Sequence, residues 1–289
     1  MNSKRGLSVI EGALAGILFG SAAVLIRFIS LDAVSIAFWR LVIASAALLA
    51  GAKIMGYSLG FDRKNLVPIL LLGALLAIHF ILFIASVKET TILNATVLVN
   101  TSPLQAVAIA ALIYHAKPNP KQSLGLAMAF AGVVLIALAD LSQFKQGSII
   151  GDVLAMLAAT SEAFYLNIGR RVRRQMQAIK TMLPVFAAAA LFTMLFSIVI
   201  AGAPSLPAEL GSIIPLLGLG LIPTALGHTL YFPSLLHLKA FETATLALIE
   251  PLGAAALGFV VFFEVPGLIF SGAAMMVLIG VAIVIYYAR

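Results

Sequence analysis

Four ionisable side chains interrupt long apolar runs of this chain and are its best candidates for chemistry. His79 occurs in LLAIHFILF and His228 in TALGHTLYF, while Glu162 and Glu250 lie in similar surroundings. An imidazole can donate, accept or exchange a proton near neutral pH, and a carboxyl group can hydrogen-bond or bind a cation. Ionisable groups are costly inside a bilayer and usually face a bundle interior or a wet cavity. We therefore interpret these residues as groups that bind a substrate or exchange protons within a membrane.

Helical spacing adds polar and aromatic neighbours to these positions. Residues three, four or seven apart share one face of a helix, which places Phe83 beside His79 and Tyr231 beside His228. The predicted cavity residues are His79, Phe83, Asn100, Glu162, Tyr165, Thr224, His228, Tyr231 and Glu250. Such a mixture fits a pocket for an amphiphilic small molecule. Packing between helices explains the same pattern, with each histidine bonded to a neighbouring carbonyl.

Other residues in the apolar runs have mainly structural interpretations. Proline lacks an amide donor and frees a carbonyl one turn earlier, so hinges or kinks are predicted at Pro103, Pro223 and Pro251. Gly12, Gly16 and Gly20 form a GxxxGxxxG pattern that indicates close helix packing. Arg40 is interpreted as a snorkelling or interfacial anchor, with a clamp for a substrate carboxylate as the alternative. Glu242 is interpreted as a residue at the membrane boundary.

The composition places all these residues in a membrane protein. The chain is 62% hydrophobic and 10% charged, whereas a soluble domain carries about 25% charged residues. The net charge of +7 lies in short segments between apolar runs, so we expect no nucleic-acid partner. The chain has no cysteine, phosphate-binding loop or metal-binding motif, and we expect no metal, cofactor or enzymatic activity. An intramembrane enzyme using His79 and Glu250 is the second hypothesis, and a channel or sensor is the third.

Ten apolar runs are long enough to cross a membrane, for which about 20 residues are needed. The predicted spans are 9–29, 33–53, 66–87, 92–114, 122–141, 149–169, 181–202, 212–236, 242–263 and 268–287. Most of the 18 Lys and Arg residues fall in the segments on one side, together with both termini. Cytoplasmic segments carry the excess of Lys and Arg. The pattern predicts a multi-pass protein of the inner (plasma) membrane with cytoplasmic N and C termini.

Conformationally special residues recur at one fixed interval. Three pairs are 148 residues apart, namely Pro103 and Pro251, Pro118 and Pro266, and Gly132 and Gly280. Such a repeat indicates duplication, with a first unit at 1–145 and a second at 146–289. Five spans per unit is an odd number, so the second unit enters the membrane from the opposite side. The predicted fold is therefore all-α, with ten transmembrane helices as two inverted five-helix repeats around a central cavity.

The order of several strings resembles a known family. They are GILFGSAAVLIRF, FWRLVIASAALL, the Pro103 helix, IEPLGAAALGFVVFFEVP and GAAMMVLIGVAIVI. Together they resemble the drug/metabolite transporter superfamily, specifically its ten-helix exporters built from two EamA-type repeats, and in particular the YddG-like branch of aromatic amino-acid exporters. The first half departs from the pattern, because Ala116 stands where the second half has Glu264.

The resemblance implies a secondary or facilitative transporter that works by alternating access. Its expected substrates are small amphipathic metabolites, above all amino acids including aromatic ones, with drugs or nucleosides as alternatives. It also implies that spans 1, 3, 4, 6, 8 and 9 line the cavity and that spans 5 and 10 are peripheral. A monomer suffices, since one chain contains both halves. Span 1 has no mid-membrane carboxylate, so any proton coupling is expected to use Glu162, Glu250 or the histidines, and uncoupled export remains the alternative.

Overall fold

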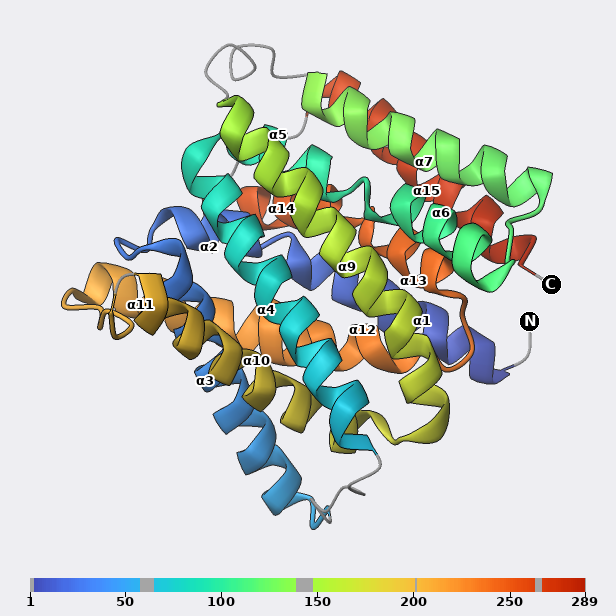
Figure 1. Cartoon of the computed structure of the whole chain (residues 1–289). Coiled ribbons are helices and arrows are strands. Elements are labelled where there is room, and N and C mark those ends of the chain that lie inside the picture. The colour runs from blue at the N-terminus through green and yellow to red at the C-terminus, as the bar shows by residue number, and fades with distance from the viewer. Residues whose placement is uncertain (1–2, 58–64, 139–147, 201, 263–266, 289) are drawn as a thin grey trace.

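A computed structural model describes residues 3–57, 65–138, 148–200, 202–262 and 267–288. All regular structure in these ranges is helical, and none of the described residues forms a strand. The helices lie together in one bundle (Figure 1). The predicted all-α class is therefore confirmed.

The first half contains α1 (Ser3–Phe19), α2 (Ala22–Arg27), α3 (Ala33–Ile54), α4 (Leu66–Glu89), α5 (Ile92–Val99), α6 (Ser102–Tyr114) and α7 (Pro120–Leu138). The second half contains α9 (Ile149–Gln175), α10 (Ala178–Ile200), α11 (Leu210–Leu219), the π-helical segment η2 (Gly220–Gly227), α12 (His228–Ser234), α13 (Ala240–Ala247), α14 (Glu250–Phe262) and α15 (Leu268–Tyr286).

Nine stretches of the described chain are long and apolar enough to cross a membrane. They are Ser3–Arg27, Ala33–Ile54, Leu66–Glu89, Asn94–Tyr114, Ile149–Gln175, Ala178–Ile200, Leu210–Ser234, Ala240–Leu257 and Leu268–Tyr286. Each overlaps one of the predicted spans. The remaining predicted span, 122–141, corresponds to α7, whose apolar part Pro120–Ile136 is shorter. Residues 139–141 of that prediction lie outside the described residues.

Three helices of the second half repeat the bounds of three in the first. Adding 148 to the bounds of α5, α6 and α7 gives 240–247, 250–262 and 268–286, which are the bounds of α13, α14 and α15. The backbone turns between the segments match as well. The amide of Thr101 donates to Leu98 O at 3.1 Å, and the amide of Ile249, 148 residues later, donates to Leu246 O at 3.2 Å.

The two membrane-length stretches that contain Pro103 and Pro251 are interrupted rather than kinked. Pro103 and Pro251 each occupy the second position of a new helical segment, after breaks at 100–101 and 248–249. A proline in the first turn has no amide that the helix would need, and its fixed φ favours helix initiation. Each proline therefore starts a second segment within one apolar stretch.

Helix α1 lies in backbone contact with the interrupted helix α13–α14. A Cβ atom at Gly16 would lie 2.6 Å from Leu246 O, and one at Gly20 would overlap the backbone at Ala254. Only glycine permits this approach. The close packing predicted for Gly12, Gly16 and Gly20 is confirmed.

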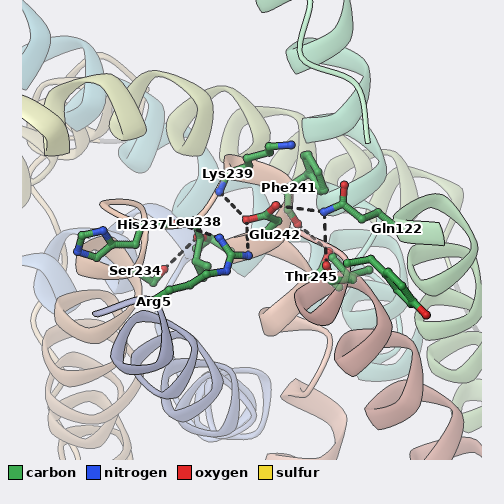
Figure 2. Close-up of polar contacts among 12 residues, drawn as sticks. Arg5, Gln122, Ser234, His237, Leu238, Lys239, Phe241, Glu242 and Thr245 are labelled. Carbon is green, nitrogen blue, oxygen red and sulfur yellow. Dashed lines mark hydrogen bonds and ion pairs between the residues drawn. The ribbon is translucent and has the colours of Figure 1, made fainter. Parts of the chain in front are cut away.

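The two ends of the chain lie at the same end of the bundle, where a buried carboxylate joins four segments (Figures 1 and 2). Glu242 at the start of α13 is 1% exposed. Its carboxylate accepts hydrogen bonds from Arg5 Nη2 at 3.1 Å, Gln122 Nε2 at 3.1 Å and the Lys239 amide at 2.9 Å. Gln122 also donates to Val284 O at 3.4 Å, near the C-terminus. The sequence placed Glu242 at the membrane boundary but gave no indication of this cluster.

Helices α7 and α15 lie side by side with glycine at their contact (Figure 1). A Cβ at Gly280 would overlap the backbone of α7 at Ala129, whereas a Cβ at Gly272 on the same helix meets nothing within 4 Å. We expect Gly280→Ala to lower the free energy of unfolding by roughly 1–3 kcal/mol through overpacking. Gly272→Ala should leave it unchanged or slightly higher. Thermal unfolding of both purified variants tests this, and equal losses would contradict the contact.

Candidate functional site

A cavity lies inside the bundle, where the two interrupted helices meet. Its lining residues are Phe19, Ala22, Arg40, His79, Phe80, Phe83, Val99, Asn100, Glu162, Pro223, His228, Ala247 and Glu250. Its free volume is about 50 Å³. A water molecule occupies about 30 Å³ of liquid, and ligand pockets usually measure about 300–1,000 Å³. This conformation therefore has room for water but must open to admit a metabolite.

The break in each interrupted helix supplies a polar side chain to the cavity. Asn100 lies in the break between α5 and α6, and Glu250 begins α14 after the equivalent break. Asn100 Nδ2 donates to Thr96 O at 2.8 Å and to Glu250 Oε2 at 3.4 Å. The Thr96 carbonyl also accepts from the Asn100 amide at 3.1 Å, so the side chain adds a second hydrogen bond there and links the two breaks. Interrupted helices of this kind form the sites of many secondary transporters.

A second carboxyl group, partly buried, comes from α9. Glu162 Oε1 accepts a hydrogen bond from the Tyr231 hydroxyl at 3.3 Å. Neither Glu162 nor Glu250 forms an ion pair within the described part of the chain, where the one ion pair found joins Arg5 and Glu242. The cavity therefore holds two carboxyl groups that are hydrogen-bonded only to uncharged side chains.

The two histidines lie in the same cavity but in different bonding environments. His79 Nδ1 lies 3.0 Å from Ala158 O, so this nitrogen must carry a proton to make the bond, and the ring is stacked on Phe83 at 6.2 Å. His228 Nδ1 has no partner among the described residues. Its ring lies 4.9 Å from Phe19 and 5.2 Å from Phe80. The bonding predicted by the packing interpretation thus occurs at His79 but is not found at His228.

Arg40 is the cationic group of the cavity. Its side chain is only 2% exposed, so the interpretation of a snorkelling interfacial anchor is wrong. Nε donates to Thr224 Oγ1 at 2.9 Å, and the guanidinium carbon lies 3.8 Å from the centre of the Phe80 ring. The hydroxyl of Thr224 donates in turn to Leu219 O at 2.5 Å. Nη1 has no partner among the described residues.

The structure brings most of the predicted cavity residues together. Six line the cavity, namely His79, Phe83, Asn100, Glu162, His228 and Glu250. Two more hydrogen-bond to lining residues, Thr224 to Arg40 and Tyr231 to Glu162. Tyr165 is buried elsewhere, with its hydroxyl 3.5 Å from Met182 Sδ.

Several lining residues were missed by sequence reasoning. Phe19 and Phe80 are surrounded by apolar residues in the sequence, so nothing distinguished them from lipid-facing side chains. Arg40 comes from α3, the second span, which the resemblance did not include among the lining helices. An arginine seven residues inside an apolar helix was the one available signal for it. No residue of α7 or α15 contributes to the described lining.

A second pocket opens near the end of the bundle that holds the termini. Its volume is about 260 Å³, and it lies between α6, α9 and the start of α13. Four of its lining residues are cationic, Arg170, Arg171, Arg174 and Lys239. Arg170 Nε donates to Leu238 O at 2.8 Å, and the guanidinium of Arg171 lies 4.2 Å from the centre of the Tyr114 ring.

A polar cavity between interrupted, membrane-length helices is characteristic of a membrane transporter. The chain belongs to the EamA-like transporter family. The model of this family matches residues 6–138 and, a second time, residues 149–286.

Individual relatives agree with this assignment without naming a substrate. An uncharacterized transporter of Archaeoglobus fulgidus is 27% identical over 92% of each chain. The uncharacterized transporter YyaM of Bacillus subtilis is 30% identical over 57% of this chain and 54% of its own. A protein of known crystal structure superposes with a TM-score of 0.79 at 18% identity, covering 96% of this chain and 95% of its own. At that identity the likeness concerns the fold alone.

The different environments of the histidines lead to opposite expectations for stability. His79→Leu removes a hydrogen bond between α4 and α9 and should lower the free energy of unfolding by about 1 kcal/mol. His228→Leu removes a buried nitrogen without a described partner, so stability should be unchanged or higher. Thermal unfolding of the two purified variants provides the comparison. A larger loss for His228→Leu would contradict the bonding described above.

Proposed function

We propose that this protein is a ten-helix permease that exports small amphipathic metabolites across the inner (plasma) membrane by alternating access. We further propose amino acids, including aromatic ones, as the substrates. The observation that carries the proposal is the cavity between the two interrupted helices, which combines a guanidinium, two carboxyl groups and three phenylalanine rings. These are the groups expected to bind the carboxylate, the ammonium and the side chain of an amino acid. We also propose that the protein belongs to the YddG-like branch of aromatic amino-acid exporters.

The proposal of ten crossings is supported by the position of the termini. An odd number of crossings would separate the N- and C-terminal ends across the membrane. Arg5, near the N-terminus, and Gln122, at the start of α7, both bind Glu242, and Gln122 also contacts Val284 near the C-terminus. These contacts favour an even number of crossings, in which α7 crosses the membrane in addition to the nine longer stretches. Cytoplasmic termini are proposed from the distribution of Lys and Arg.

Two inverted units, 1–145 and 146–289, are proposed as the scaffold for alternating access. The 148-residue offset between helix bounds and the double match to one family model support a duplication. Five crossings per unit would invert the second unit relative to the first. One chain contains both units, so a monomer is proposed to be sufficient.

A substrate panel in proteoliposomes tests the proposed activity. We expect flux of aromatic amino acids into or out of vesicles that contain the purified protein, compared with protein-free vesicles. The assay should be run with and without a pH gradient. Full flux at equal pH would exclude obligatory proton exchange, and gradient-dependent flux would support it. Flux of nucleosides or drugs alone would change the substrate class, and the absence of all flux would contradict transport of the tested classes.

The same assay tests the histidines. We expect His228→Ala to reduce flux, because its ring contacts Phe19 and Phe80 in the cavity wall and its Nδ1 has no described partner. Unchanged uptake and efflux in both His79→Ala and His228→Ala would exclude a transport role for this pair.

We propose that the contacts of Glu242 hold the bundle closed at the end where the chain termini lie. Arg5, Gln122 and the Lys239 amide converge on one carboxylate (Figure 2). Removing a charge from a buried ion pair weakens the contact strongly. We expect Glu242→Gln to increase the access of solvent to the cavity from this end several-fold.

The absence of cysteine from the chain makes this prediction measurable. An Ala247→Cys variant places one thiol in the cavity wall. Its rate of modification by a membrane-impermeant thiol reagent should rise when Glu242→Gln is added. Glu209→Gln, at an exposed acid that precedes α11, is the matched control. Equal rates in both backgrounds would contradict the proposed closure.

A further inference from the structure

We infer that Arg40 binds the carboxylate of the transported molecule, so that the preferred substrates are acids with an apolar or aromatic body. This inference rests on the proposed transport function and specifies which substrate group is recognised and by which residue. It assigns to α3 a direct part in the substrate site.

The Arg40 side chain has a buried donor that no described residue satisfies. A guanidinium carries five N–H donors. Nε is satisfied by Thr224, whereas Nη1 is buried without a partner among the described residues. A buried charge without a counter-ion is unfavourable, because the lost hydration is not replaced. A ligand carboxylate would supply both the negative charge and the missing acceptor.

The two carboxyl groups of the cavity form hydrogen bonds with other residues but no ion pair with Arg40. Glu250 accepts from Asn100 Nδ2 at 3.4 Å, and Glu162 accepts from the Tyr231 hydroxyl at 3.3 Å. Neither forms an ion pair with Arg40 in the described structure. Arg40 therefore lines the cavity without a direct ion-pair partner among the described residues.

The guanidinium of Arg40 lies over an aromatic ring. The ring of Phe80 covers one face of the group, with the guanidinium carbon 3.8 Å from the ring centre. Stacking of this kind holds the plane of the guanidinium and leaves its edge for hydrogen bonding. The edge of an arginine matches the two oxygens of a carboxylate, a fit that the ammonium of lysine does not reproduce.

The surrounding residues are complementary to the remainder of such a ligand. The rings of Phe19 and Phe83 form part of the wall, and the carboxyl groups of Glu162 and Glu250 are also in the lining. An amino acid would place its carboxylate at Arg40 and its ammonium toward these acids. A simple aromatic acid would use Arg40 and the rings alone.

The basic pocket near the termini is an independent observation in favour of an anionic substrate group. Its cations lie on α9 and at the start of α13, the helices that also contribute Glu162 and Ala247 to the central cavity. On α9, Arg170 follows Glu162 by eight residues, or about 12 Å along the helix. A cluster of cations at this position would raise the local concentration of anions.

The test compares matched ligands on the purified full-length protein by thermal unfolding and equilibrium binding. Tryptophan carries both charges, tryptophanamide and tryptamine lack the carboxylate, and indole-3-propionate lacks the ammonium. The wild-type protein should bind tryptophan about 10- to 100-fold more tightly than tryptophanamide, which is the effect of one charge-assisted hydrogen bond. This comparison uses only the wild-type protein, so it does not depend on whether a variant folds.

Variants then assign the effect to Arg40. Arg40→Gln should remove the preference for tryptophan over tryptophanamide, and Arg40→Lys should retain only part of it, since the charge remains without the planar edge. Lys53→Gln, at an exposed position of the same helix, should leave the preference unchanged. Thermal unfolding without ligand establishes that each variant is folded.

The possible outcomes separate this inference from the proposed export of amino acids. Equal binding of tryptophan and tryptophanamide by the wild type, or an unchanged preference in folded Arg40→Gln, would overturn the role of Arg40 while leaving transport intact. Arg40-dependent binding of indole-3-propionate without amino-acid binding would support Arg40 and contradict amino acids as substrates. Binding of none of the four ligands would overturn the inference.

Discussion

The cost of leaving backbone hydrogen-bonding groups unpaired in an apolar medium is the constraint on which this structure depends. Two membrane-length helices nevertheless stop and restart, at 100–101 and 248–249. Both breaks are turned toward the protein interior, where the Asn100 side chain donates a second hydrogen bond to the Thr96 carbonyl and Glu250 lines the cavity. The prolines that follow have no amide to lose. At these two breaks, interrupted backbone and polar side chains therefore occur together.

Much of the helical arrangement could be predicted from the sequence, because membrane-length helices depend on the length of apolar runs. The Pro103–Pro251 interval also indicates where the two interruptions lie. The sequence did not distinguish a kinked helix from a restarted one, since proline is compatible with both.

The candidate site was predictable where polarity contrasted with its surroundings. His79, His228, Glu162 and Glu250 are conspicuous in apolar runs, and all four reach the cavity. The direction in which a helix faces is harder to read when nearly every residue is apolar, so Phe19 and Phe80 carried no signal. Arg40 was interpreted mainly as an interfacial residue. Its position within the apolar run does not show whether the side chain extends to water or packs on Phe80. Glu242 needed the fold, since its partners lie 120 and 237 residues away.

The contact between α7 and α15 has a mechanical consequence. Gly125, Gly132 and Gly280 bring the two backbones so close that added methyl groups would overlap main-chain atoms of the opposite helix. Backbones packed at this distance cannot slide past one another unless the helices first separate, because their atoms would overlap. We therefore expect α7 and α15 to move as one unit. Neither helix contributes to the described lining of the cavity, so a change in cavity volume need not disturb their contact.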